Sequence, residues 1–180
     1  MPVGSPVVLG VDPDTQATGL ALLQGEKVLM VGLAAIDRHL EPRPRGKDAA
    51  GLMAAIVGWK IRNVFKGHEY AVVEFPQVYK GKKVDPNNLT LLAAVSGAVC
   101  AAVGHFHVHL TYPTEWKGQT PKSIHQKRIL KRIGWEFVDN GVKKCPTPIV
   151  PEDVKVIGDV PEGRWKEIVD AIGIALHAAS

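Results

Sequence analysis

Residues 7–22 read VVLGVDPDTQATGLAL, and this stretch decides the fold. An apolar run ends at Asp12, a short polar turn follows, and a second apolar run begins at Gly19. The pattern predicts a buried strand with a carboxylate at its C-terminal end, joined by a hairpin to the next strand. A carboxylate in that position is costly unless it is paired, hydrogen-bonded or bound to a metal.

Two later segments repeat this placement of acids beside apolar residues. Residues 71–74, AVVE, predict another apolar strand that ends in Glu74. Residues 167–176, EIVDAIGIAL, predict an apolar helix whose first turn carries Glu167 and Asp170. These two acids are three residues apart and therefore lie on one face of that helix. Three elements that are distant in sequence each offer carboxylates, which indicates a metal-dependent active site.

The rest of the chain alternates between strand and helix patterns. We expect strands at residues 7–11, 19–24, 27–35, 70–74 and 106–112, and helices at 48–66, 86–103, 121–133 and 164–178. Residues 135–163 are rich in proline and are expected to be irregular, with one short strand. The helix at 48–66 has apolar spacing at Leu52, Ile56, Trp59 and Val64, and Trp59 is expected to pack in the core or against another helix.

This order of elements predicts an α/β protein with a mixed five-stranded sheet flanked by helices, arranged as in ribonuclease H. In that fold the first and fourth strands are neighbours, so Asp12 and Glu74 would meet at one end of the sheet. A final helix packed across the same end would bring Glu167 and Asp170 to that point.

Composition indicates a soluble globular protein with a single domain, residues 1–180. Hydrophobic residues make up 46% of the chain and charged residues 22%. The start of the chain lacks the pattern of a secretory signal. Two cysteines define neither a disulfide framework nor a zinc site, which favours a reducing compartment such as the cytoplasm. We interpret the uncharged helix at 86–103 as buried or interfacial and expect no membrane span.

The net charge of +4 is unevenly distributed. Residues 117–132 contain six basic residues and no acid, namely Lys117, Lys122, Lys127, Arg128, Lys131 and Arg132. Two smaller basic clusters are Lys80, Lys82 and Lys83, and Arg38, Arg43, Arg45 and Lys47. Any one cluster could be an ordinary solvated surface. Three together indicate a polyanionic partner such as nucleic acid.

Several of these segments also form an ordered set. They are residues 10–13 (GVDP) with Thr18 and Gly19, Val73 and Glu74, residues 112–117 (YPTEWK) with Pro121 and Lys122, and residues 170–177 (DAIGIALH). With these residues the chain resembles the RuvC family of Holliday junction resolvases, in particular its phage-type members. The resemblance extends over almost the whole chain.

The resemblance implies a two-metal nuclease with two Mg²⁺ ions per active site, for which Mn²⁺ could substitute. The metal ligands would be Asp12, Glu74, Glu167 and Asp170, with Asp12 bridging the two ions. Glu167 stands where the family usually has aspartate or histidine. Lys117 and Lys122 would act near the scissile phosphate. DNA-binding residues would be Tyr79, Lys80, Lys82, Lys83, Lys117, Lys122, Lys127 and Arg128, with Tyr79 as the stacking wedge. Asp14 replaces a glycine of the family and is interpreted as a turn residue, with a metal-facing acid as the alternative.

The expected activity is the resolution of four-way DNA junctions by paired symmetric nicks in a bacterial or phage-infected cell. Small residues in the helix at 86–103 predict a two-fold homodimer through that helix. Two alternatives stay open: a nuclease for other branched DNA such as flaps or forks, and a protein that binds junctions without cutting them. An actin-like phosphotransferase would need two lobes, for which 180 residues are too few.

Overall fold

A mixed six-stranded sheet forms the centre of the computed structural model, which describes residues 4–78, 85–104, 107–141 and 144–179. The strand order is β5-β4-β1-β2-β3-β8. The strands are β1 (Val7–Asp12), β2 (Ala17–Gln24), β3 (Lys27–Ala35), β4 (Tyr70–Glu74), β5 (Val108–Thr111) and β8 (Lys155–Ile157). The first three strands are antiparallel to one another, β4 runs parallel to β1 and to β5, and β8 runs parallel to β3.

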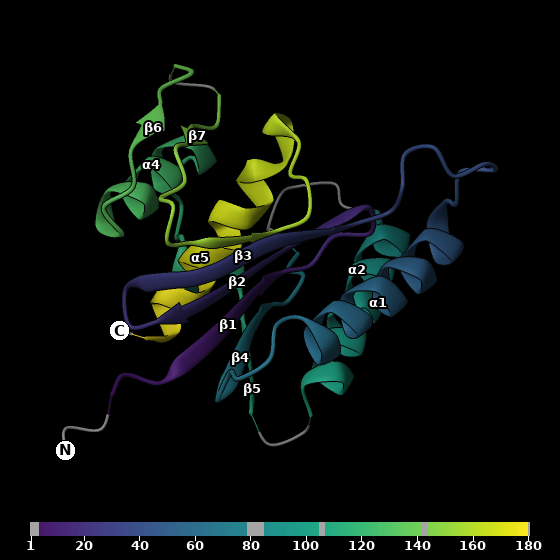
Figure 1. Cartoon of the computed structure of the whole chain (residues 1–180). Helices are drawn as coiled ribbons and strands as arrows, with labels where there is room; N and C mark the ends of the chain where they lie inside the picture. Colours follow the sequence, from purple (N-terminus) through teal and green to yellow (C-terminus); the bar gives the residue numbers. More distant parts are fainter. Residues whose placement is uncertain (1–3, 79–84, 105–106, 142–143, 180) are drawn as a thin grey trace.

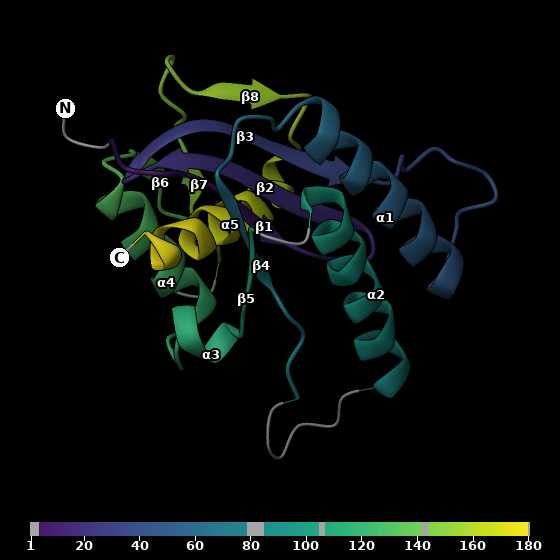
Figure 2. The same ribbon diagram turned by 90° about the horizontal axis from the view of Figure 1, so that it is seen from below.

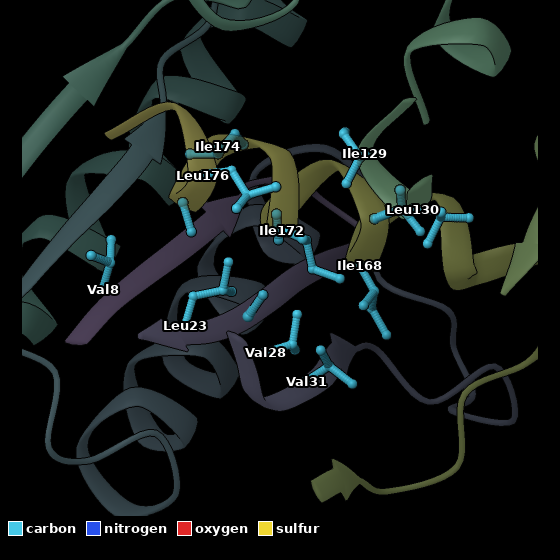
Figure 3. Close-up of a cluster of buried hydrophobic side chains, with 14 of the residues drawn as sticks. Val8, Leu23, Val28, Val31, Ile129, Leu130, Ile168, Ile172, Ile174 and Leu176 are labelled. Carbon is cyan, nitrogen blue, oxygen red and sulfur yellow. The ribbon is translucent and has the colours of Figure 1, made fainter. Parts of the chain in front are cut away.

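Helices cover both faces of this sheet (Figures 1 and 2). One face carries α1 (Gly46–Asn63) and α2 (Pro86–Val103). The other face carries α5 (Trp165–Ala178), flanked by α4 (Lys122–Arg132) and by the short α3 (Pro113–Trp116). A hairpin of β6 (Phe137–Val138) and β7 (Thr147–Pro148) lies above α4, and a 3₁₀ turn, η1 (Glu162–Arg164), leads into α5. In Figure 3 the apolar side of α5 meets strand side chains such as Leu23 and Val31.

Two glycines let α5 approach the sheet closely. A Cβ atom on Gly10 of β1 would overlap with the carbonyl oxygen of Ala171, and one on Gly19 of β2 would overlap with that of Glu167. Gly19 pairs with Asp12 across the β1–β2 ladder. The helix that carries two of the acids therefore rests directly on the strand pair that carries the third.

The expected fold class is confirmed, the five expected strands are present, and the first and fourth are neighbours as expected. The region at 135–163 differs, because its described residues form three short strands and not one. Two of them close the β6–β7 hairpin, and β8 extends the sheet by pairing with Met30–Gly32 of β3. Strands of two or three residues are too short to show an alternating pattern, so their partners alone define them.

The expected packing of Trp59 is wrong, because this residue is 57% exposed. The buried face of α1 contains Met53, Val57 and Ile61, which lie one or two positions along the helix from the expected residues. This rotation lets the small residues of α1 contact α2, for example Gly58 against Ala102. The apolar spacing alone did not reveal that α1 packs against both a sheet and a second helix.

Candidate active site

Asp12 and Glu74 lie side by side at one end of the sheet. They end β1 and β4, which are parallel neighbours, and the preceding residues Val11 and Val73 are paired in register. Those valines are completely buried, so the two strands are fixed by the core while the acids emerge at its edge. The expectation that these two strand ends meet is confirmed.

Glu167 and Asp170 reach the same point from the first turns of α5. Both are buried, with 8% and 2% of their surface exposed. Carboxylate oxygens of Asp12, Glu167 and Asp170 all lie within 4.8 Å of one another. Among the described residues, this group of acids has the geometry to hold a metal ion.

Helix α4 holds Asp170 from the opposite side. Lys122 Nζ lies 2.5 Å from Asp170 Oδ2 and 3.5 Å from Glu167 Oε2. The carboxamide of Gln126, which is completely buried, donates through Nε2 to Asp170 Oδ1 at 2.8 Å and to the carbonyl oxygen of Lys166 at 2.9 Å. Burial opposes the charge of Lys122, but the carboxylates of Asp170 and Asp12 raise the pKa of Lys122 above its usual value.

Glu74 is oriented by the segment that follows β5. Its Oε2 accepts a hydrogen bond from the indole N–H of Trp116 at 2.7 Å and lies 3.4 Å from Lys117 Nζ. The Lys117 ammonium lies 4.7 Å from the centre of the Trp116 ring, a cation–π distance. Glu115 fixes the start of α3 by accepting the backbone N–H of Tyr112 at 2.6 Å. This short helix therefore places both Trp116 and Lys117 against Glu74.

The acids repel one another in the absence of a cation. Burial, followed by the charges of Asp170 and Glu74, raises the pKa of Asp12 well above the usual range of a carboxyl group, and the nearby Lys122 offsets only part of this. A divalent cation would relieve the repulsion. The donors are carboxylate oxygens, which suit Mg²⁺. The residues present therefore fit the metal centre that the sequence predicts.

Asp14 belongs to the turn between β1 and β2. Its Oδ1 accepts the backbone N–H groups of Gln16 at 2.7 Å and Ala17 at 3.2 Å. The Thr18 hydroxyl donates to the Asp14 carbonyl oxygen at 3.2 Å and closes the same turn. This arrangement agrees with the interpretation of Asp14 as a turn residue, and Asp14 is not part of the acid group at the metal centre.

The expected DNA-binding residues have mixed surroundings. Lys127 is held within the protein by Asp139 at 2.6 Å. Arg128 is exposed and lines a pocket of about 250 Å³ between α4 and α5, together with His125 and His177. The remaining four, Tyr79, Lys80, Lys82 and Lys83, lie outside the described residues.

Three residues that contact the acids, Gln126, Trp116 and Arg164, were not predicted from the sequence to do so. Gln126 follows Lys122 by four residues, so both lie on one face of α4, and this spacing was the available signal. The Trp116 indole was a second clue, since buried Trp N–H groups usually have a partner. Arg164, whose Nη1 lies 3.6 Å from Glu167 Oε1, precedes that acid by three residues, and this spacing was a third signal.

Solved structures with similar folds identify the architecture. RuvC from T. thermophilus in complex with a Holliday junction substrate superposes with a TM-score of 0.56 and 20% identity, over 96% of this chain and 92% of that one. The chain has the RuvC fold. A second Thermus thermophilus RuvC structure gives a TM-score of 0.52 and 19% identity, over 96% and 93% of the two chains. The yeast mitochondrial Holliday junction resolvase Ydc2 gives 0.56 and 10% identity, over 98% and 78%. No family model and no curated protein matches this chain.

Proposed function

We propose that this protein is a structure-selective endodeoxyribonuclease that resolves four-way DNA junctions in the cytoplasm of a bacterial or phage-infected cell. The observation that carries this proposal is the meeting of Asp12, Glu167 and Asp170 within 4.8 Å, beside Glu74, in a fold shared with RuvC. The solved RuvC structure with a junction substrate and the yeast resolvase support junctions as the substrate class.

The four acids would hold two Mg²⁺ ions, with Mn²⁺ as a substitute. Bound together, two such ions orient and deprotonate a water and stabilise the leaving oxygen of a phosphodiester. Gln126 and Trp116 each occupy one oxygen of a ligand carboxylate and thereby orient Asp170 and Glu74.

Lys117 and Lys122 supply positive charge at the same place. In the described structure each ammonium pairs with an acid of the site, Lys117 with Glu74 and Lys122 with Asp170. With metal ions held by these acids, the ammonium groups of Lys117 and Lys122 would be free to face a phosphate. They would then stabilise the negative charge that develops on the phosphate in the transition state.

The decisive experiment is cleavage of a labelled synthetic four-way junction in Mg²⁺, beside a linear duplex. Asp12→Asn removes one charge from the metal centre. Asp14→Asn is the matched control, because asparagine keeps the side-chain oxygen that closes the turn. We expect paired, symmetric nicks from the wild type and from Asp14→Asn, and none from Asp12→Asn.

Two other outcomes would replace the proposal. Efficient cutting of flaps or forks with slow, unpaired cutting of four-way junctions would assign a different branched substrate. Tight junction binding without cleavage in either Mg²⁺ or Mn²⁺ would make the protein a binding module. The turn role of Asp14 and the position of Glu167 within the acid group both support the nuclease over that module.

We also propose that the protein is a homodimer through α2. Only 17% of this apolar 18-residue helix is buried within the chain, and its exposed side carries the small residues Ala94, Gly97 and Ala101. By length and composition alone α2 could cross a membrane, with a mean hydropathy of 1.4. A second copy of the chain would cover this surface and place two active sites around one two-fold axis, as paired nicks require.

Gly97→Leu tests the dimer. Nothing lies within 4 Å of a Cβ at Gly97, so leucine fits the isolated chain and would obstruct only a close partner. Light scattering at micromolar concentration should give twice the chain mass for the wild type and the chain mass for the variant. A monomeric wild type would refute the dimer. If the wild-type protein were recovered in solution only with lipid vesicles or detergent, the result would indicate membrane association.

A further inference from the structure

A second basic site lies beside the acid group of the candidate active site. It is a groove of about 610 Å³ between the end of β3, the loop at 36–46, α1 and the segment before η1. Figure 1 shows that loop projecting past the end of the sheet. The cationic side chains of the groove, called the arginine groove below, are Arg38, Arg43, Lys60 and Arg164.

The charge of the arginine groove is unbalanced. Two acids, Asp37 and Asp159, also line it, but within the described part of the chain neither forms an ion pair with its cations. Arg43 instead contacts the Gln16 side chain at 3.4 Å, and Lys60 donates to the Leu33 carbonyl oxygen at 2.9 Å.

Lys60 gives further support for an anion site. Burial lowers the pKa of its ammonium group, and that group donates its hydrogen bond to a neutral carbonyl oxygen. Asp37 Oδ1 accepts the backbone N–H of His39 at 2.9 Å. The four cations of the groove outnumber its two acids, and among the described residues Arg164 is the one groove cation with an ion pair, to Glu167.

The arginine groove is continuous with the metal centre. Arg164 lines the groove and lies 3.6 Å from Glu167, one of the candidate metal ligands. Gln16 also lines the groove and belongs to the turn that directly follows Asp12. A DNA strand with one phosphate at the metal centre would therefore place its neighbouring phosphates in or beside the groove.

We propose that the arginine groove binds backbone phosphates of the DNA strand being cut, next to the scissile phosphate. Arg38 and Arg43 supply the main contacts from the loop, and the apolar side chains of Leu33 and Ile36 border the sugar. This inference rests on the proposed function. Phosphate contacts of this kind set the position and register of the strand and carry no base information.

The test compares two double variants in the non-cleaving Asp12→Asn background. Arg38→Ala/Arg43→Ala removes two charges from the groove. Arg62→Ala/Lys66→Ala removes two charges from exposed positions at the end of α1 that do not line it. Junction affinity is measured over a series of salt concentrations, because each lost phosphate contact lowers the slope of log K against log salt by roughly 0.9.

We expect the groove variant to lose roughly one to two units of this slope and to bind about tenfold or more weakly. The control should keep the slope of its parent. In a further experiment, single phosphates of the junction DNA are replaced by neutral methylphosphonates. Replacements next to the cleavage site should weaken DNA binding by the parent protein but not by the groove variant.

Three results would overturn the proposal. The groove variant could keep the parent slope, or the control could lose as much as the groove variant. Alternatively, inorganic phosphate at millimolar concentration could raise the Tm of the parent protein but not of the groove variant, while DNA binding is the same in both. That result would make the arginine groove a site for small anions. Failure of the wild type to cut or select junctions is a separate result and would count against the proposed function itself.

Discussion

Replacing Asp12 with asparagine is expected to stabilise the metal-free protein and to remove its stabilisation by Mg²⁺. The pKa of Asp12 is raised first by burial and then by the charges of Asp170 and Glu74. Folding therefore favours the protonated carboxyl group. Its contribution to stability is complete below the usual carboxyl pKa and is lost as pH rises through the raised value. Asparagine carries no charge at any of these pH values. The free energy of unfolding of the variant should therefore exceed that of the wild type by more as the pH rises towards neutral.

The size of the effect follows from the distances at the site. Asp12 has carboxylate oxygens within 4.8 Å of those of Glu167 and Asp170. At an effective dielectric constant of about 20, two unit charges at that separation repel by about 3.5 kcal/mol. The Lys122 ammonium and solvent offset much of this, so we expect a net gain of about 1–3 kcal/mol in the free energy of unfolding at neutral pH. For a chain of this size that corresponds to a rise of about 2–12 °C in Tm.

Thermal melts in EDTA and in Mg²⁺, repeated from acidic to neutral pH, measure both effects. At a Mg²⁺ concentration about ten times Kd, binding should stabilise the wild type by about 1.4 kcal/mol. Asp12→Asn should show a higher Tm in EDTA and little response to Mg²⁺, whereas Asp14→Asn should behave as the wild type. The reasoning would be refuted by a lower Tm of Asp12→Asn in EDTA, or by a Mg²⁺ response equal to that of the wild type.

Two further substitutions test how the site is built. Gly19→Ala places a Cβ against the carbonyl oxygen of Glu167 and should lower the free energy of unfolding, measured in urea, by about 1–3 kcal/mol. The control Gly51→Ala has open space in α1 and should change this free energy little or raise it by up to about 1 kcal/mol. Equal effects of the two substitutions would contradict the close approach of α5 to the sheet. Gln126→Leu removes the hydrogen bond from Gln126 Nε2 to Asp170 Oδ1 and should weaken Mn²⁺ binding in calorimetry by about 10–100-fold. Unchanged affinity would exclude this positioning role.

The acid group of the candidate active site was largely predictable from local patterns. The acids lie at the end of β1, at the end of β4 and in the first turns of α5, and each of these elements is strongly apolar. A few neighbouring residues are therefore enough to predict where each acid lies on its element. The strand order then follows from rules of connection that apply to many α/β proteins. For this reason the sequence alone assigns Asp12, Glu74, Glu167 and Asp170 to one place.

The surroundings of those acids were decided only by the tertiary structure. Gln126 and Trp116 are recognisable as partners of Asp170 and Glu74 only when α3 and α4 have packed beside α5. The arginine groove likewise joins four separate segments of the chain. Hydrophobic periodicity reports which side of an element is buried, but it carries no information about which polar groups meet across a packed interface. The sequence alone therefore determined the elements and their acids, whereas three-dimensional packing decided what holds those acids and which cations lie beside them.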